Sequence, residues 1–205
     1  MSEQILDNLP ALVDQAHQIA VDCGWWTDLD TGLPIVRDRG TLLMLCVTEV
    51  CEAAEAWDNR AMDDKLPHRR GVEVELADLL LRVFDFIPGL GFRDQFLEAM
   101  DKLEGTRVPY YGMEGAPPPG QARFFAIVRH LGDAMEAARK DTPSRRYPHL
   151  SGLAVHTAQA VRATLQIGRL LNADLHGALV EKMAFNRQRE DHKIEHRRAA
   201  GGKKV

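Results

Sequence analysis

The sequence has few cysteines and no long apolar run. Only Cys23, Cys46 and Cys51 occur among 205 residues, and their number and spacing fit neither a disulfide framework nor a zinc site. This scarcity favours a reducing, cytoplasmic setting. Charged residues interrupt every apolar segment before it reaches membrane-spanning length. The opening MSEQILDNLPALVDQAHQ also lacks the charged and then apolar pattern of a secretory signal. We therefore expect a soluble, intracellular protein with no membrane partner.

The sequence also lacks an excess of positive charge. Its formal net charge is −4, with 27% charged and 45% hydrophobic residues, as is ordinary for a soluble globular protein. The C-terminal stretch KIEHRRAAGGKKV is locally basic, and we interpret it as a solvated chain end. No general basic field exists to hold nucleic acid, so nucleic acid is not an expected partner.

Signals for β-strands are missing as well. β-Branched residues are scattered, and no Asn-Gly or Asp-Gly turn separates alternating runs. Helical periodicity dominates instead and predicts an all-α helical bundle. Thr41 is the expected N-cap of the second helix, and Pro88-Gly89 is expected to end the third. The predicted helices cover residues 11–26, 41–61, 71–87, 92–105, 122–140, 151–171 and 174–195.

A Gly- and Pro-rich stretch, YGMEGAPPPGQ (111–121), divides the chain. It cannot continue a helix, so we predict a linker between a first half at 1–110 and a second half at 122–205. The second half resembles the first, because LCVTEVCEAAEAWDNR (45–60) aligns with AIVRHLGDAMEAARKD (126–141). Two tandem four-helix-type halves are the prediction, and chance likeness between amphipathic helices is the alternative.

Carboxylates interrupt two otherwise apolar helices. Glu49 and Glu52 share one face of the second helix, and Glu75 and Asp78 lie on a narrow stripe of the third. Burying an unpaired carboxylate costs several kcal/mol or more. Four carboxylates brought together by adjacent helices cannot all stay ionised without cations, and oxygen-only ligands suit Mg²⁺ or Mn²⁺. The alternative is that Arg82, on the same stripe, neutralises part of the charge.

These motifs resemble those of the MazG-like nucleotide pyrophosphohydrolases, in the all-α NTP pyrophosphatase superfamily. The family pattern of Glu-x-x-Glu followed by Glu-x-x-Asp matches EVCE (49–52) and ELAD (75–78). HQIAVDCGWW (17–26), LADLLLRVFDF (76–86) and the C-terminal KMAFNRQREDHKIEHRRAAGGKKV are also similar to family members. The resemblance covers residues 10–105 and, less closely, the C-terminus. It departs from many members in that this chain is doubled.

The resemblance implies an activity and a site. Such enzymes use Mg²⁺ to cleave a nucleoside triphosphate into the monophosphate and pyrophosphate, and a pool-cleaning role on deoxynucleotides is the preferred version. The implied metal ligands are Glu49, Glu52, Glu75 and Asp78. Glu52 would accept the proton of the attacking water, with Glu49 beside it in the catalytic pair. A phosphoribosyl-ATP pyrophosphohydrolase and a non-catalytic nucleotide- or partner-binding module remain alternatives.

The resemblance also implies substrate contacts from the last helix. Lys182, Asn186 and Arg189 would approach the phosphates there. From the residues alone, Lys65 and Arg69 in the loop MDDKLPHRRG (62–71) could either bind phosphates or stay solvated. Trp25 or Trp26 could stack on the base, but a core role is the alternative and at most one of them is expected to do so.

The second half does not repeat the four carboxylates. The aligned positions hold His130, Asp133, His156 and Gln159. We therefore expect one working site per chain, with the degenerate half acting as a built-in dimer partner, so that the protein is a homodimer or a pseudo-dimer. The two histidines and Asp133 could alternatively form a separate transition-metal site.

Overall fold

A computed structural model describes residues 2–106, 120–199 and 201–202, and these residues form an all-α fold. Isolated bridges are their only extended pairings, with no strand. The predicted linker lies outside the described residues except for 120 and 121. The elements in chain order are α1 (Ser2–Asp7), α2 (Leu9–Asp22), α3 (Arg39–Asn59), α4 (Gly71–Gly89), α5 (Arg93–Lys102), η1 (Gly120–Arg123), α6 (Phe125–Lys140), α7 (Gly152–Leu170), α8 (Leu175–Gln188), η2 (Glu190–His192) and α9 (Ile194–Arg198).

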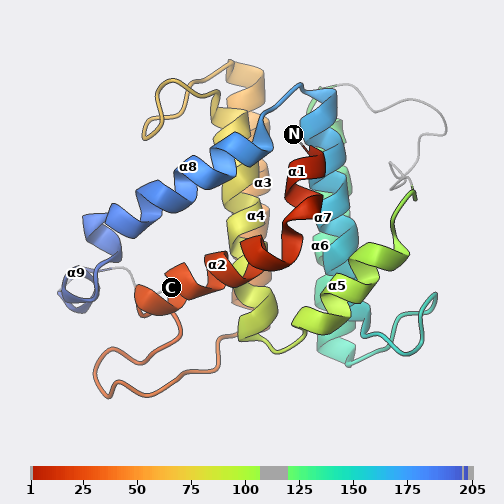
Figure 1. The fold of residues 1–205 in the computed structure, drawn as a ribbon, viewed down its shortest axis with the longest axis horizontal. Helices are drawn as coiled ribbons and strands as arrows, with labels where there is room; N and C mark the ends of the chain where they lie inside the picture. The colour runs from red at the N-terminus through yellow and green to blue at the C-terminus, as the bar shows by residue number, and fades with distance from the viewer. Residues whose placement is uncertain (1, 107–119, 200, 203–205) are drawn as a thin grey trace.

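Two helix pairs form the centre of the molecule. The helices α3 and α4 pack along each other, and α6 and α7 do the same beside them (Figure 1). The helix α2 crosses α4. One buried hydrophobic cluster includes side chains from both pairs, such as Leu80 and Phe84 of α4 and Ile127 and Leu131 of α6. The two predicted halves therefore share one continuous core.

The predicted N-cap of α3 is wrong, and α4 ends at Gly89, two residues beyond the predicted range. Asp38, not Thr41, is the N-cap of α3, because its carboxylate accepts a hydrogen bond from Thr41 N at 2.6 Å. The helix α4 continues through Pro88. It ends just before Gly91, which has a left-handed φ of 77°, and Phe92 N donates to Ile87 O there. A proline in the last turn therefore does not set the end of this helix.

The outer predicted helices are divided. The predicted first helix begins earlier, as α1 and α2, and Pro10 lies in the first turn of α2, where its missing N–H is tolerated. That helix ends before Gly24, whose φ is 72°. The predicted helix at 174–195 ends at Gln188, because Arg189 has an extended backbone. The short elements η2 and α9 then turn the chain back toward α2.

The connections within the two helix pairs have matching geometry. Each begins with a left-handed residue, Arg60 or Asp141, and each contains one isolated antiparallel bridge. In each, the first glycine of the next helix donates a backbone hydrogen bond of 2.8 Å across the turn, from Gly71 to Ala61 O and from Gly152 to Thr142 O. Each position in the first connection and its counterpart in the second are separated by the same number of residues as in the sequence alignment of the two halves.

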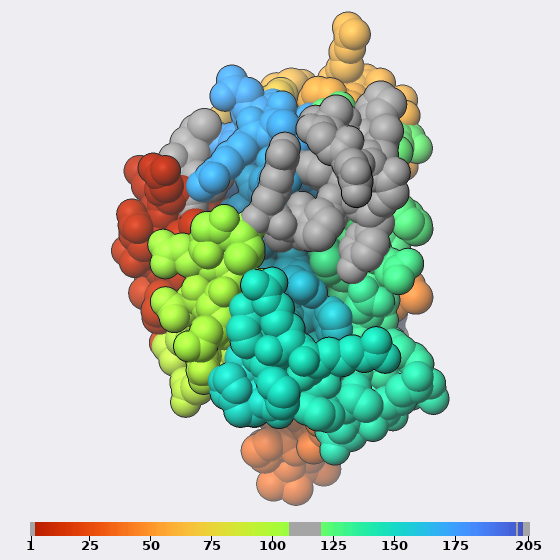
Figure 2. Space-filling model, turned by 90° about the vertical axis from the view of Figure 1, so that its right-hand side faces the viewer, coloured from red at the N-terminus to blue at the C-terminus, as the bar shows by residue number. Residues whose placement is uncertain are grey.

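The helix that follows each pair packs on the other pair. The helix α5 lies against α7, and α8 lies against α4. Figure 2 shows α5, in yellow-green, beside the loop at 141–151 that connects α6 and α7. There His149 Nε2 lies 2.8 Å from Glu98 Oε1, and Tyr147 Oη donates to Lys102 O at 3.1 Å. Each half is therefore covered by a helix from the other.

Among the described residues, no helix combines the length and the apolar character that crossing a membrane would require.

Candidate metal and phosphate site

Three of the four predicted metal ligands meet between α3 and α4. Glu49 of α3 and Glu75 and Asp78 of α4 each offer a carboxylate oxygen, and these oxygens all lie within 4.8 Å of one another. Glu49 is buried, with 4% of its surface exposed, and the other two are half-buried. Glu52, one turn farther along α3, is exposed and lies outside this group. We call Glu49, Glu75 and Asp78 the acid cluster.

Two cations already contact the acid cluster. Arg82 Nε donates to Glu49 Oε1 at 2.5 Å. Arg82 therefore neutralises part of the negative charge, as in the alternative interpretation of the sequence. Lys182 of α8 is buried, and its Nζ lies 2.6 Å from Asp78 Oδ2. The predicted approach of the last helix to the first half is therefore present, but Lys182 contacts a carboxylate. Within the described part of the chain, no cation forms an ion pair with Glu75.

Burial and mutual repulsion raise the pKa values of the carboxyl groups at this site. Burial, followed by the charges of Asp78 and Glu49, raises the pKa of Glu75 to about 8. Burial raises the pKa of Asp78 to about 6, although Lys182 acts in the opposite direction. Burial and the charge of Glu49 raise the pKa of the Glu52 carboxyl as well. A divalent cation could replace the proton on Glu75, and the oxygen-only donor set suits Mg²⁺ or Mn²⁺.

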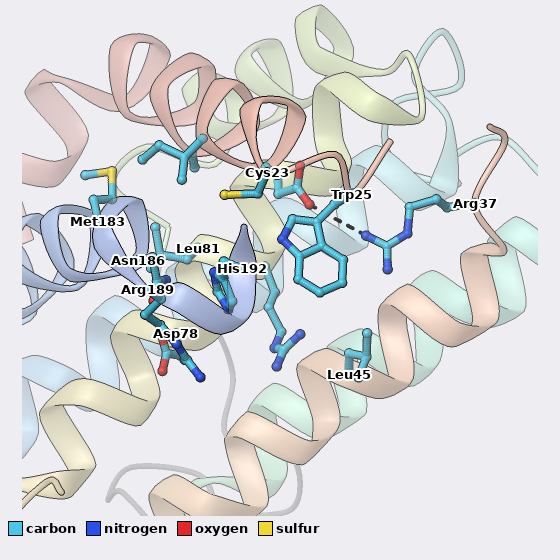
Figure 3. Close-up of a pocket in the computed structure, with 15 residues that line it drawn as sticks. Cys23, Trp25, Arg37, Leu45, Asp78, Leu81, Met183, Asn186, Arg189 and His192 are labelled. Atoms are coloured by element: carbon cyan, nitrogen blue, oxygen red, sulfur yellow. Dashed lines mark ion pairs between the residues drawn. The ribbon is translucent and has the colours of Figure 1, made fainter. Parts of the chain in front are cut away.

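A pocket with a volume of about 250 Å³ adjoins the acid cluster. Asp78 and Arg82 line it from α4, and elements from both ends of the chain complete it. Figure 3 shows Trp25 and Arg37 on one side and Asp78, Asn186 and Arg189 on the other. Three arginines, Arg37, Arg82 and Arg189, therefore line a cavity with one edge at the carboxylates, an arrangement suited to an anionic ligand that carries a metal.

Of the two adjacent tryptophans, Trp25 lines this pocket. Its ring meets His192 edge to face at 5.6 Å, and the Arg197 guanidinium lies 3.5 Å from its centroid. Trp26 is buried and donates to Asp85 Oδ1 at 2.7 Å. Of these two tryptophans, Trp25 lines the pocket and Trp26 belongs to the core.

Asn186 of α8 and Arg189, directly after the end of α8, also reach the pocket. Asn186 Oδ1 is buried, and the described part of the chain provides no hydrogen-bond partner for it. Arg189 forms two bonds with Asp191, at 2.8 and 2.7 Å. A phosphate would therefore compete with Asp191 for the Arg189 guanidinium.

The two loop cations have different positions. Lys65 pairs with its neighbour Asp64 at 2.9 Å, and its charge opposes the rise in the pKa of Glu52, so it lies near the acidic face. Arg69 instead forms bonds of 2.9 and 2.8 Å to Glu181 and lies 3.3 Å from Asp174. The guanidinium of Arg69 thus ties the loop to α8 and does not line the pocket.

Two pocket residues escaped the sequence analysis. Arg37 lies in the irregular segment before α3, and its guanidinium stands 5.5 Å from the Trp26 ring centroid. His192 lies in η2, beyond the end of α8. Neither belongs to a periodic pattern that would assign it to a face, so only the folded arrangement brings them to the site.

Comparison of the chain with protein-family models, with curated proteins and with solved structures gave no match. Its function therefore has to be inferred from the residues and geometry of the site.

Proposed function

We propose that the protein is a Mg²⁺-dependent nucleoside triphosphate pyrophosphohydrolase that cleaves between the α and β phosphates. The observation that carries the proposal is the acid cluster at the edge of a pocket lined by Arg37, Arg82 and Arg189. Oxygen ligands for Mg²⁺ and guanidinium groups for phosphates are the two requirements of a triphosphate site. The match of EVCE and ELAD to the MazG-like pattern supports the same reaction.

The residues divide into two roles in this proposal. Glu49, Glu75 and Asp78 would hold Mg²⁺, with Glu52 at the rim. When bound, Mg²⁺ neutralises phosphate charge and makes a coordinated water more acidic. A water then attacks the α-phosphorus in line, the bond to the bridging oxygen breaks, and pyrophosphate leaves. Glu52 accepts the proton of that water, which its exposed position on α3 permits.

The pocket cations would act on the substrate. Arg82 and Arg189 contact the phosphates after exchanging their present carboxylate partners, Glu49 and Asp191. Trp25 provides an aromatic wall for the base. Lys182 is a positioning residue, because it contacts Asp78 and not the pocket.

We further propose that the chain consists of two MazG-like halves and that the second half has lost the acidic site. The matching connections after α3 and α6 support this, as does the crossing of α5 and α8 onto the opposite pair. In this arrangement the second half supplies Lys182, Asn186 and Arg189 to the first, as a partner subunit would. A pseudo-dimer in one chain is therefore favoured over a homodimer.

One observation favours a non-catalytic binding module as the second candidate. Two of the three carboxylates of the acid cluster are already paired, Glu49 with Arg82 and Asp78 with Lys182. Such pairs can neutralise the stripe without a metal. In that case nucleotide would still bind between the arginines but would not be cleaved.

The test is a hydrolysis panel. The purified chain is incubated with Mg²⁺ and each ribo- and deoxynucleoside triphosphate, dUTP and phosphoribosyl-ATP, and the products are quantified by chromatography. Monophosphate and pyrophosphate, lost in Asp78→Asn but kept in Glu55→Gln, would support the proposal. Glu55 is the matched control, because it is an exposed carboxylate one turn beyond Glu52 on α3. Diphosphate with orthophosphate, or no turnover together with nucleotide-induced thermal stabilisation, would overturn it.

A further inference from the structure

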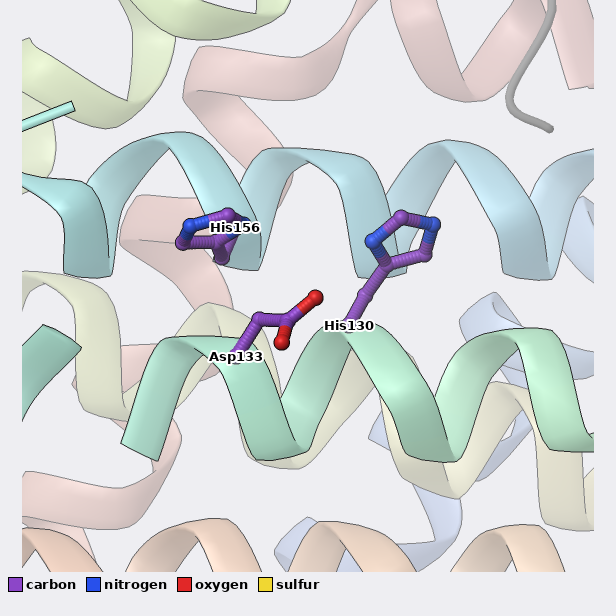
Figure 4. Close-up of side chains that lie close together, drawn as sticks. All are labelled: His130, Asp133 and His156. Atoms are coloured by element: carbon purple, nitrogen blue, oxygen red, sulfur yellow. The ribbon is translucent and has the colours of Figure 1, made fainter. Parts of the chain in front are cut away.

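A second cluster of metal-ligating side chains lies between α6 and α7. His130 and Asp133 extend from α6 toward α7, and His156 lies on α7 near them (Figure 4). One donor atom from each lies within 4.8 Å of the others. His130 is buried, and the other two are half-buried. We call these three residues the histidine cluster.

The position of the histidine cluster parallels that of the acid cluster. In the alignment of the two halves, His130 corresponds to Glu49 and His156 to Glu75. The connections that follow α3 and α6 have matching hydrogen bonds, so the two helix pairs hold these positions in similar relative places. A location that gathers oxygen donors in one pair therefore gathers two imidazoles and a carboxylate in the other.

The hydrogen bonds orient one of the two imidazoles as a ligand. His156 Nδ1 lies 2.8 Å from Gln159 Oε1, and an amide oxygen can only accept, so Nδ1 carries the proton. The lone pair is then on Nε2. Metal-binding histidines have their second nitrogen held by an outer partner in this way. Gln159 is thus placed as the outer partner of His156.

The remaining two groups suit the same chemistry. The ring of His130 is buried within this group of donors, and an imidazole nitrogen placed there can donate a lone pair to a metal ion. Asp133 provides a carboxylate and lies 3.5 Å from Arg129, with which a bound cation would compete. Two neutral imidazoles and one carboxylate select borderline transition metals over Mg²⁺.

We propose that His130, Asp133 and His156 bind a transition-metal ion of the Zn²⁺ class, which joins α6 to α7. Zinc–nitrogen bonds are about 2.0–2.1 Å long, so the three donors must move closer together by small side-chain rotations. With three protein ligands, water fills the remaining coordination position. This site is separate from the acid cluster and does not depend on its function.

The test is a competition titration with Zn²⁺. The full chain is stripped with chelator and titrated with Zn²⁺ against a chromophoric chelator, in the Asp78→Asn background and in excess Mg²⁺ to silence the acid cluster. We expect each chain to bind one equivalent of Zn²⁺ in competition with the chelator. The affinity for Zn²⁺ should be at least tenfold weaker in His156→Gln. The matched control is His149→Gln, because His149 is an exposed histidine that lies 2.8 Å from a carboxylate but outside the cluster. It should bind Zn²⁺ as the background does.

Asp133→Asn provides a second variant, so the test does not depend on one substitution folding correctly. Circular dichroism confirms helical content before titration. The absorption spectrum of bound Co²⁺ distinguishes a site made of nitrogen and oxygen ligands from a site that includes one of the three free cysteines. A thiolate ligand adds a near-ultraviolet band. Zinc affinity within twofold of the background in both His156→Gln and Asp133→Asn, no retained equivalent, or a thiolate band would overturn the proposal.

Discussion

The α3–α4 and α6–α7 pairs have matching connections but different chemistry in their interfaces. The first holds three carboxylates with Arg82 and Lys182, and the second holds two histidines and Asp133. The position that corresponds to Arg82 in the second pair is the buried Ala163. At the positions aligned with Glu49, Glu75 and Arg82, the second pair therefore holds His130, His156 and Ala163. The comparison teaches that two helix pairs with the same connections can differ at a few inward positions, and that these positions decide which donor atoms the pair gathers.

Removing a ligand from the acid cluster should have the largest effect. Asp78→Asn keeps the shape of the side chain but lowers its affinity for a cation, so we expect the hydrolysis rate to fall by at least ~100-fold. Initial rates at saturating Mg²⁺ measure this. The exposed counterparts Glu55→Gln and Glu136→Gln should each remain within about twofold. Similar losses in all three variants would show that the acid cluster has no special role.

Removing the positive charge of Lys182, which the second half contributes to the first, should have the largest effect on stability. Lys182→Met leaves Asp78 without its buried partner, which costs about 3 kcal/mol of unfolding free energy in comparable cases. Lys140→Met breaks an exposed pair with Glu136 and should cost less than about 1 kcal/mol. Urea denaturation measures both. Equal costs would mean that Lys182 is not a buried partner of Asp78.

The matching connections predict that replacing either of two glycines by alanine lowers the stability of the protein by the same amount. A Cβ at Gly71 would lie 2.9 Å from Ala56 Cβ, and one at Gly152 would lie 2.8 Å from Ala137 Cβ. Gly71→Ala and Gly152→Ala should each destabilise by about 1–3 kcal/mol. Gly132→Ala, in open space on α6, should stabilise by about 0.5–1 kcal/mol. Thermal unfolding compares the three, and a large difference between Gly71→Ala and Gly152→Ala would break the parallel.

The last predicted effect is on the pH dependence of Mg²⁺ affinity. The pKa of Glu75 is raised from its ordinary 4.5 to about 8, so without metal this group favours the folded state at low pH, and stability falls as pH rises through that window. Because Mg²⁺ must displace the proton, its affinity should rise with pH by up to about tenfold per unit until about pH 8. Calorimetry in two buffers measures the released proton.

Glu75→Gln removes this titrating group and should flatten the dependence above about pH 6, below which Asp78, whose pKa burial raises to about 6, still titrates. The His130 ring, whose pKa burial lowers to about 4, contributes nothing in the same pH window. A slope that persists unchanged in Glu75→Gln would contradict the assignment of the proton to Glu75.

Helical periodicity was enough to predict the all-α fold and the meeting of Glu49, Glu75 and Asp78. The apolar residues on either side fix the inward faces of α3 and α4, and the carboxylates follow from their spacing. The ends of helices were less predictable. Whether Pro88 ends α4 depends on the left-handed turn at Gly91, which does not belong to a periodic pattern.

The partners of the site residues were the least predictable part. Lys182 was expected to approach the first half, but its contact with Asp78 depends on α8 crossing α4. Arg69 was expected either to bind phosphates or to stay solvated, whereas Glu181 and Asp174 of the α8 region bind its guanidinium. Contacts between segments so far apart in sequence depend on the packing of whole helices, which a local pattern does not contain.

The crossing of α8 onto α4 has a consequence for the order of events during synthesis. Lys182 follows Asp78 by more than one hundred residues, and α8 packs on α4. The first helix pair, α3–α4, is therefore synthesised well before the residue that pairs with Asp78. The carboxylate of Asp78 has no buried partner until α8 has been made and has packed on α4.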